Sequence, residues 1–286
     1  MNVRCVMSVF EIMFSPTGGT KKVSNVFTKA FAPESTVIDL LKKDQDFSAC
    51  SFAKEDVCIV SVPSYGGRVP APAVERLAQM KGNGAAAILV VVYGNRDFDD
   101  TFAELQDTLA AAGFACMAGI AAIAEHSIMR QFAAGRPDSG DEEQLRRFAE
   151  EVRKKLQGQA EQKARSEMEH PAGAGSQVKA DNPVKPDGFV LPGNRPYRKY
   201  GGVPMKPQAG KKCTRCGVCA AECPVGAIFT DDPSKTNAEI CISCMRCIAV
   251  CPQNARSNSK ALLAAGSLML KKECSVRKEN TLFFCK

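Results

Sequence analysis

The sequence lacks tryptophan altogether, has only four tyrosines, and contains two histidines, His126 and His170. Aromatic contacts with a bound molecule must therefore come from tyrosine or phenylalanine. Long apolar runs are also absent: none approaches the roughly 18 residues of a membrane-spanning helix, so we expect no membrane span. The N-terminus does not show the basic start, apolar core and small-residue cleavage site of a signal peptide, which favours a cytoplasmic location.

The composition is that of a folded, water-soluble protein, with 45% hydrophobic and 24% charged residues over 286 positions. This length leaves room for two domains of ordinary size. The net charge of +7 is unevenly distributed. Eight lysines and arginines, against Asp181 and Asp187, lie between positions 171 and 212, so most of the excess charge is local.

Seven prolines and few bulky aliphatic residues lie between positions 171 and 207. We predict a proline-rich basic linker over residues 158–207, either extended or wrapped as an arm on the folded domains. A solvated linker is the simplest interpretation. The alternative is a docking arm for an acidic redox partner, in which Arg195, Arg198 and Lys199 would raise the encounter rate. No nucleic-acid recognition motif accompanies the basic residues, so we expect no nucleic-acid partner.

Cysteine is the residue that the sequence has in excess, with 14 copies. Eight of them form two runs of identical spacing, C-x2-C-x2-C-x3-C-P, which end at Pro224 and Pro252. This spacing is typical of [4Fe–4S] ligands in two-cluster ferredoxins, where the fourth cysteine of each run binds the other cluster. The predicted ligand sets are therefore Cys213, Cys216, Cys219 and Cys251 for one cluster, and Cys241, Cys244, Cys247 and Cys223 for the other.

Zinc and disulfide bonds are the alternatives for these cysteines. Structural zinc is closed by four ligands, usually in two pairs, and does not require the observed spacing. Disulfides would point to an exported protein, for which the sequence gives no support. The other six cysteines are scattered without metal-ligand spacing: Cys5, Cys50, Cys58, Cys116, Cys274 and Cys285. Free thiols and iron–sulfur clusters both fit a reducing cytoplasm, and they favour an anaerobic organism.

Upstream of the linker, apolar β-rich segments alternate with amphipathic ones. We expect strands at 6–14, 36–41, 57–62, 85–92 and 115–124, separated mostly by helices. This alternation predicts an α/β fold with a doubly wound, five-stranded parallel sheet. The C-terminal part would add a small α+β two-cluster domain. The predicted domains are 1–157, the linker 158–207, the cluster domain 208–258, and a C-terminal helix and tail at 259–286.

Ligands of such sheets bind beyond the carboxyl ends of the strands, so the loops after the first, third and fourth strands are informative. The first of these loops, residues 15–20, combines hydroxyl groups with two glycines at the start of a helix, which suits an anion such as phosphate. The nucleotide-binding patterns G-x4-G-K-[ST] and G-x-G-x-x-G are absent. By itself, the loop is equally compatible with an ordinary helix cap.

Taken together, the three loops resemble the flavin-binding loops of flavodoxins. The first is similar to the (S/T)-x-T-G-x-T phosphate loop, and the third to the G-N-R-x-aromatic loop. The resemblance implies FMN as a cofactor, with its phosphate held by Ser15, Pro16, Thr17, Gly18, Gly19 and Thr20. It implies that the flavin ring is framed by Ser64, Tyr65, Gly66, Gly67, Arg68, Tyr93, Gly94, Asn95, Arg96, Asp97 and Phe98. Candidates for stacking on the ring are Tyr65, Tyr93 and Phe98, with core packing as the alternative for each.

Over nearly its full length the sequence resembles the flavodoxin–ferredoxin fusion proteins of anaerobes. The resemblance implies FMN, two [4Fe–4S] clusters and electron transfer to or from protein redox partners. No acid–base pair indicates a specific substrate, so no catalytic residue is assigned. Two alternatives remain: a redox-sensing interaction protein with a basic docking arm, and a reductase of a small oxidised molecule near Arg68 and Arg96. For His126, a structural hydrogen bond is a simpler interpretation than proton donation.

Overall fold

The computed structural model describes residues 7–169 and 189–284. The centre of the protein is a sheet of six strands in the order β2-β1-β3-β4-β5-β8. Five strands run parallel: β1 (Val9–Met13), β2 (Thr36–Asp39), β3 (Val57–Pro63), β4 (Ala86–Tyr93) and β5 (Ala115–Ile123). Their order, 2-1-3-4-5, is that of flavodoxin-like doubly wound sheets. The predicted fold class is confirmed.

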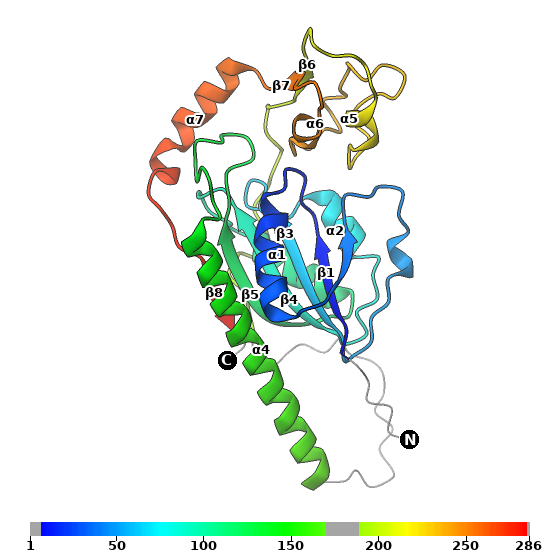
Figure 1. Ribbon diagram of the computed structural model, residues 1–286, viewed down its shortest axis with the longest axis vertical. Helices are drawn as coiled ribbons and strands as arrows, with labels where there is room; N and C mark the ends of the chain where they lie inside the picture. The colour runs from blue at the N-terminus through cyan, green and yellow to red at the C-terminus, as the bar shows by residue number, and fades with distance from the viewer. Residues whose placement is uncertain (1–6, 170–188, 285–286) are drawn as a thin grey trace.

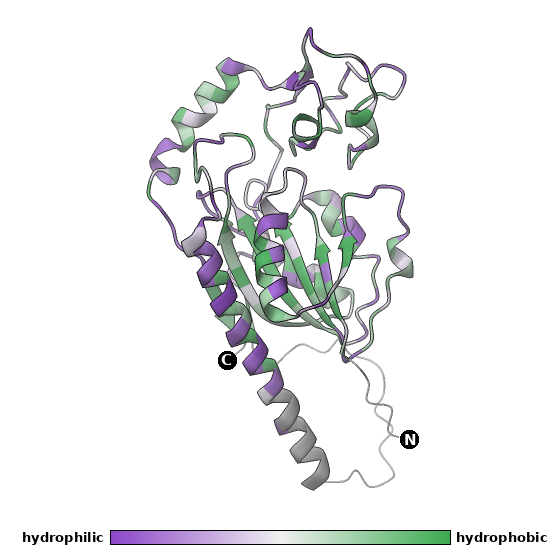
Figure 2. Cartoon of the chain, viewed as in Figure 1, coloured by the Kyte–Doolittle hydropathy of each residue, from purple (hydrophilic) through white to green (hydrophobic). Residues whose placement is uncertain are grey.

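Helices cover both faces of the sheet because its central strands are apolar on both sides. On one face α1 (Gly19–Phe31) packs against α4 (Ser139–Glu169). On the other face lie α2 (Ala71–Leu77) and α3 (Thr101–Ala111). A short 3-10 helix, η1 (Phe47–Ala49), lies between β2 and β3. Figure 2 shows the apolar strands behind helices that are largely hydrophilic outside.

The sixth strand is β8 (Thr281–Phe284), which pairs antiparallel with β5. No strand was expected here, because four residues are too short to show a period of their own. Phe283 packs against Phe98 and Phe102, with ring centroids 6.4 and 5.5 Å apart. The C-terminal segment thereby covers the sheet edge that β5 would otherwise expose.

The segment 189–207, called the crossing segment below, packs on the first domain. Leu191 is 1% exposed and lies so close to β5 that a Cβ added at Gly119 would come within 2.5 Å of it. Gln106 donates to the Phe189 carbonyl (2.8 Å). Residues 189–207 are therefore not a solvated linker but lie on the first domain as an arm. Helix α4 also continues to Glu169, past the expected start of the linker.

Acidic residues beside and within α3 hold the crossing segment. Arg195 pairs with Asp107 (2.8 Å) and Arg198 with Asp99 (2.6 Å). Asp100 accepts a hydrogen bond from the Arg198 N–H (2.7 Å). These two arginines neutralise the chain's own carboxylates, so they are not free for the acidic partner that the sequence suggested.

The second domain contains α5 (Val218–Ala221), α6 (Arg246–Ala249) and a small sheet of β6 (Gln208–Ala209) and β7 (Arg256–Ser257). Figure 1 shows this domain beyond the edge at which the parallel strands end. None of the described helices is long and apolar enough to cross a membrane.

Two arginines join the domains by hydrogen bonds to main-chain carbonyls. Nη1 of Arg246 donates to the Pro16 carbonyl (3.2 Å), and Nη2 of Arg76 donates to the Pro224 carbonyl (2.5 Å). Helix α7 (Lys260–Cys274) then leads the chain back from the second domain to the first (Figure 1). The second domain is thus attached at both of its ends.

Truncation of Leu191 tests whether the crossing segment belongs to the core. We expect Leu191→Ala to lower the free energy of unfolding by about 2–5 kcal/mol, the usual cost of such a core cavity. Val190→Ala is the matched control, because Val190 is 71% exposed and should change stability by less than about 0.5 kcal/mol. Denaturant midpoints followed by circular dichroism measure both. Equal effects would contradict the assignment.

Candidate functional site

A cavity of about 220 Å³ lies at the carboxyl edge of the sheet, between the two domains. The first domain lines it with the loops after β1, β3, β4 and β5. The crossing segment contributes Tyr200, Val203 and Met205, and the second domain contributes Ile242 and Ser243. The three loops that resemble flavin-binding loops therefore meet in one cavity, where ligands of such sheets bind.

The loop after β1 presents the N-terminus of α1 to this cavity. Gly18 caps the helix in the left-handed conformation (φ 91°), which favours glycine, and the first turn contains no acidic residue. The Ser15 hydroxyl accepts a hydrogen bond from the Lys21 N–H (2.8 Å) and so shapes the loop itself. The first N–H groups of a helix have no partner within it, which fits a phosphate group. Four loop residues line the cavity: Pro16, Thr17, Gly19 and Thr20.

The loop after β3 is divided between the cavity and the crossing segment. Three of its residues line the cavity: Ser64, Tyr65 and Gly66. Arg68 instead forms an ion pair with Glu104 through two hydrogen bonds (2.6 and 2.8 Å) and donates to the Arg198 carbonyl (2.7 Å). Gly67 approaches Asp99 so closely that an added Cβ would come within 2.2 Å. Gly67 and Arg68 thus fix the loop rather than face the cavity.

The loop after β4 is divided in the same way. Four of its residues line the cavity: Tyr93, Gly94, Arg96 and Asp97. Phe98 packs on Phe102 in the aromatic core (5.2 Å between ring centroids), which favours core packing over stacking for this residue. Asn95 is buried, and its Nδ2 donates to the carbonyls of Cys274 and Val276 (2.8 Å each). The loop therefore anchors the C-terminal segment as well.

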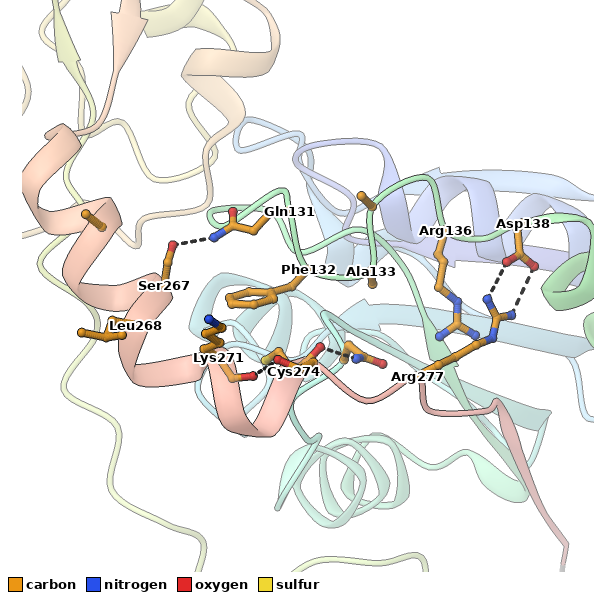
Figure 3. A pocket seen from close by; sticks show the side chains of 14 residues that line it. Gln131, Phe132, Ala133, Arg136, Asp138, Ser267, Leu268, Lys271, Cys274 and Arg277 are labelled. Atoms are coloured by element: carbon orange, nitrogen blue, oxygen red, sulfur yellow. Dashed lines mark hydrogen bonds and ion pairs between the residues drawn. The ribbon is translucent and has the colours of Figure 1, made fainter.

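A wider hollow of about 720 Å³ lies between α7 and the loop after β5 (Figure 3). Gln131 donates to the Ser267 hydroxyl across it (2.6 Å), and Arg277 pairs with Asp138 (2.7 Å). These contacts fasten α7 and the following segment to the first domain. These contacts could not be predicted from local sequence, because the partners lie more than 130 positions apart.

Sequence reasoning missed the residues that the crossing segment and the second domain contribute to the cavity. The Tyr200 ring lies against Gly66, where an added Cβ would come within 2.2 Å of it. Tyr200 is therefore a further aromatic candidate for contact with a flavin ring. Ile242 and Ser243 are not predicted as cavity residues from sequence, because they stand between cysteines with the spacing of cluster ligands. The sequence feature that could have indicated this contact is Tyr200 itself, an aromatic residue among the prolines and glycines of the predicted linker.

His126 borders the cavity on the β5 side. Its ring packs on Gly94, where an added Cβ would come within 2.7 Å. Nδ1 accepts hydrogen bonds from the N–H groups of Ile128 and Met129 (3.2 Å each), so the neutral ring carries its proton on Nε2. Burial lowers the pKa of His126 to about 4. The imidazole is therefore a neutral hydrogen-bond donor at physiological pH.

The eight cysteines of the second domain lie in two groups of four. One small cavity is lined by Cys213, Cys216, Cys219 and Cys251. In the other set, burial raises the pKa of Cys244 to about 12, and three neighbouring thiols act in the same direction: Cys223, Cys247 and Cys241. Such thiols give up their protons when they bind iron.

Hydrogen-bond donors surround the sulfur atoms. The N–H groups of Ala227 and Ala255 donate to the sulfurs of Cys223 and Cys251 (3.2 and 3.3 Å). Bonds of this kind stabilise thiolates and so fit cluster ligands. Within residues 7–169 and 189–284, no three side chains of histidine, cysteine, aspartate or glutamate are arranged to hold a single metal ion.

The comparisons with known proteins identify the second domain. Residues 212–255 match the family described as 4Fe-4S dicluster domain. The ferredoxin-like protein in the nif region of Rhizobium leguminosarum bv. trifolii is 42% identical over 48 residues, which cover 14% of this chain and 75% of that protein. The chain therefore belongs to the dicluster ferredoxin family through this domain. With the flavodoxin-like first domain, it has the organisation of a flavodoxin–ferredoxin fusion, which supports an electron-transfer protein of the flavin and iron–sulfur class.

Solved structures also resemble the first domain. A Streptococcus pneumonia TIGR4 flavodoxin is 22% identical with a TM-score of 0.37, and the match covers 52% of this chain and 99% of that one. A flavodoxin from the domain Archaea is 14% identical with a TM-score of 0.40, and the match covers 53% and 99%. The strand order, rather than these similarities, identifies the fold of the first domain.

The protonation of His126 can be followed by NMR of full-length protein labelled with ¹⁵N-histidine and holding oxidised clusters. We expect a neutral ring with Nε2 protonated at pH above about 5.5, and proton uptake only near pH 4, because burial disfavours the cation. Since the folded pKa lies below the ordinary value of about 6.5, this group costs stability as pH falls from 6.5 towards 4. His126→Gln assigns the signal. A titration midpoint near 6.5 would contradict the expectation.

Proposed function

We propose that the protein carries electrons between FMN in the cavity and two [4Fe–4S] clusters in the second domain, and exchanges them with a protein redox partner. The observation that carries the proposal is the position of Ile242 and Ser243. These residues stand between Cys241 and Cys244, and they line the flavin cavity. A single loop thus adjoins both kinds of site.

When bound, FMN exchanges one or two electrons and each cluster exchanges one, so the pair can convert two-electron transfer into single steps. The chain's part is to bind these groups, fix their orientation and keep water away. The loop after β1 would hold the phosphate, while Tyr65 and Tyr200 would enclose the ring. Burial raises the pKa of Tyr65, as do the nearby Cys244 and Tyr200. The hydroxyl of Tyr65 therefore stays protonated between the two sites.

The two cluster sites differ in their distance from the cavity, which supports an order of transfer. The proximal set is Cys241, Cys244, Cys247 and Cys223, because the cavity is lined by residues of its loop. The distal set is Cys213, Cys216, Cys219 and Cys251. Cys216 is exposed, so a partner protein can approach the distal cluster closely. Electrons would then pass along the line from partner to distal cluster, proximal cluster and flavin, or the reverse.

The other candidate functions find less support. A reductase of small molecules needs an open flavin face, but Tyr200, Ile242 and Ser243 lie over the cavity. A redox sensor with a basic docking arm needs free cations, but Arg195 and Arg198 are paired within the chain. The electron carrier is therefore the function that the geometry favours.

Removal of one proximal ligand tests the order of transfer. We expect Cys244→Ser to keep FMN and to abolish reduction of the flavin by cluster electrons, because the proximal site joins the distal site to the flavin. Anaerobic stopped-flow spectroscopy follows the flavin after the distal cluster is reduced, with iron and FMN quantified in each sample. Cys50→Ser is the matched control, since Cys50 belongs to neither set.

Cys216→Ser is the complementary variant, because it removes a ligand of the distal cluster instead of the proximal one. It should weaken the distal cluster and slow electron uptake from a protein reductant, while transfer between the proximal cluster and the flavin persists. Flavin reduction at the normal rate in Cys244→Ser protein that has lost iron would disprove the proposed order.

Removal of the Tyr200 ring tests whether the flavin is covered. We expect Tyr200→Ala to speed the reaction of the reduced flavin with small oxidants such as dioxygen, because the ring shields the cavity. Tyr200→Phe keeps the ring and serves as the control. The rate of flavin reoxidation in the full chain is the measurement. No change in either variant would show that the flavin is already open.

A further inference from the structure

A buried arginine lies beside the cysteine sets. Arg256, the first residue of β7, is only 3% exposed. Its Nε donates to the sulfur of Cys219 (3.2 Å). Nη1 donates to the Thr236 hydroxyl (2.9 Å) and the Pro207 carbonyl (3.3 Å), and Nη2 donates to the Pro233 carbonyl. Three neutral acceptors therefore hold the planar guanidinium against one cluster ligand.

Within residues 7–169 and 189–284, the hydrogen bonds and ion pairs of Arg256 include no carboxylate. A buried charge without an opposite charge is strongly unfavourable. Among the groups that Arg256 contacts, the sulfur of Cys219 is the one that can become negative. A [4Fe–4S] cluster with four thiolate ligands carries a net negative charge, so the cluster would supply the missing anion.

Arg256 lies next to the distal cysteine set. It lines the same small cavity as the four members of that set: Cys213, Cys216, Cys219 and Cys251. Ala255, the residue before it, donates its N–H to the sulfur of Cys251 (3.3 Å). The arginine therefore stands where its charge can act on the distal cluster.

Other basic residues of the second domain lack this combination. The Arg215 side chain is 71% exposed and lies 3.6 Å from Asp232, so water and a carboxylate screen its charge. Arg246 pairs with Glu222. Arg256 is set apart by its burial and by the lack of a carboxylate among its partners.

We propose that Arg256 is the internal counterion of the distal cluster and raises its reduction potential. The inference rests on the proposed function, in which two clusters exchange electrons. It adds a residue that sets the driving force of that electron transfer. When a donor gives one electron to a cluster, the cluster becomes one unit more negative, and Arg256 keeps its proton. A fixed positive charge in a site with little water stabilises the more negative state.

The test is a redox titration of full-length protein, monitored by electron paramagnetic resonance, with iron and sulfide quantified. We expect Arg256→Gln to make reduction of the distal cluster about tenfold less favourable, a shift of about 59 mV to lower potential for one electron. The proximal cluster should shift in the same direction by less. Arg215→Gln is the matched control, because loss of a screened charge should shift either potential much less.

Arg256→Lys separates charge from shape, because it keeps the positive charge without the planar fork. We expect its potentials to lie closer to those of the wild type than to those of Arg256→Gln. Unchanged potentials in Arg256→Gln protein with full iron would overturn the inference. If Arg256→Gln loses its clusters, Arg256→Lys should retain them, and loss in both variants would also overturn it. A wild-type protein without two clusters would instead refute the proposed function.

Discussion

The carboxylates of Asp99, Asp100 and Asp107 hold the crossing segment on the first domain, and the rest of the site depends on them. This segment brings Tyr200 to the wall of the cavity proposed for FMN and then enters the second domain. Together with buried Leu191, these contacts fix the path of a segment that is rich in proline and glycine. Arg195 and Arg198, two of the basic residues that made the sequence resemble a docking arm, are the partners of these acids. Their charge serves the internal geometry of the protein, which matters because electron transfer between buried groups requires a fixed separation.

The return path of the chain has an equally specific anchor. Arg136 and the fully buried Asp141 form an ion pair at the start of α4, and the Lys278 carbonyl accepts a hydrogen bond from the same arginine (2.7 Å). Asn280 donates to Asp141 (3.2 Å), and its Oδ1 accepts from the Ile123 N–H (2.9 Å). A buried ion pair of this kind contributes orientation more reliably than net stability. Because the second domain is held at its entry and at its exit, its cluster loops keep one orientation over the carboxyl edge of the sheet.

Much of this fold follows from local sequence, because apolar runs and their turns predict strands without knowledge of partners. The cysteine runs are equally local, and the crossed sets follow from their spacing. Local sequence fails where the decisive contact is distant. Arg68 stands in a loop that resembles a flavin-binding loop, but Glu104 engages it from α3. Thr281–Phe284 becomes a strand only because β5 offers an edge and Phe98 offers a ring. Tyr200 lies at the cavity because acids about a hundred positions earlier fix its segment.

The cavity and the distal cysteine set also differ in how far they are exposed to solvent. The cavity proposed for FMN is lined by the crossing segment and by the loop of Cys241 and Cys244, whereas the distal cysteine set has an exposed member. A second groove of about 410 Å³ runs beside Tyr65, Tyr200 and Cys241, so the proximal side is reachable from solvent along one path. Lys206 donates to the Cys241 carbonyl at this groove. In the proposed electron carrier, a protein partner would approach the exposed distal set, whereas the groove adjoins the proximal set. The difference in exposure defines a path from the surface, through the two cysteine sets, to the cavity. A buried arginine beside the distal set would set the driving force of electron transfer along this path.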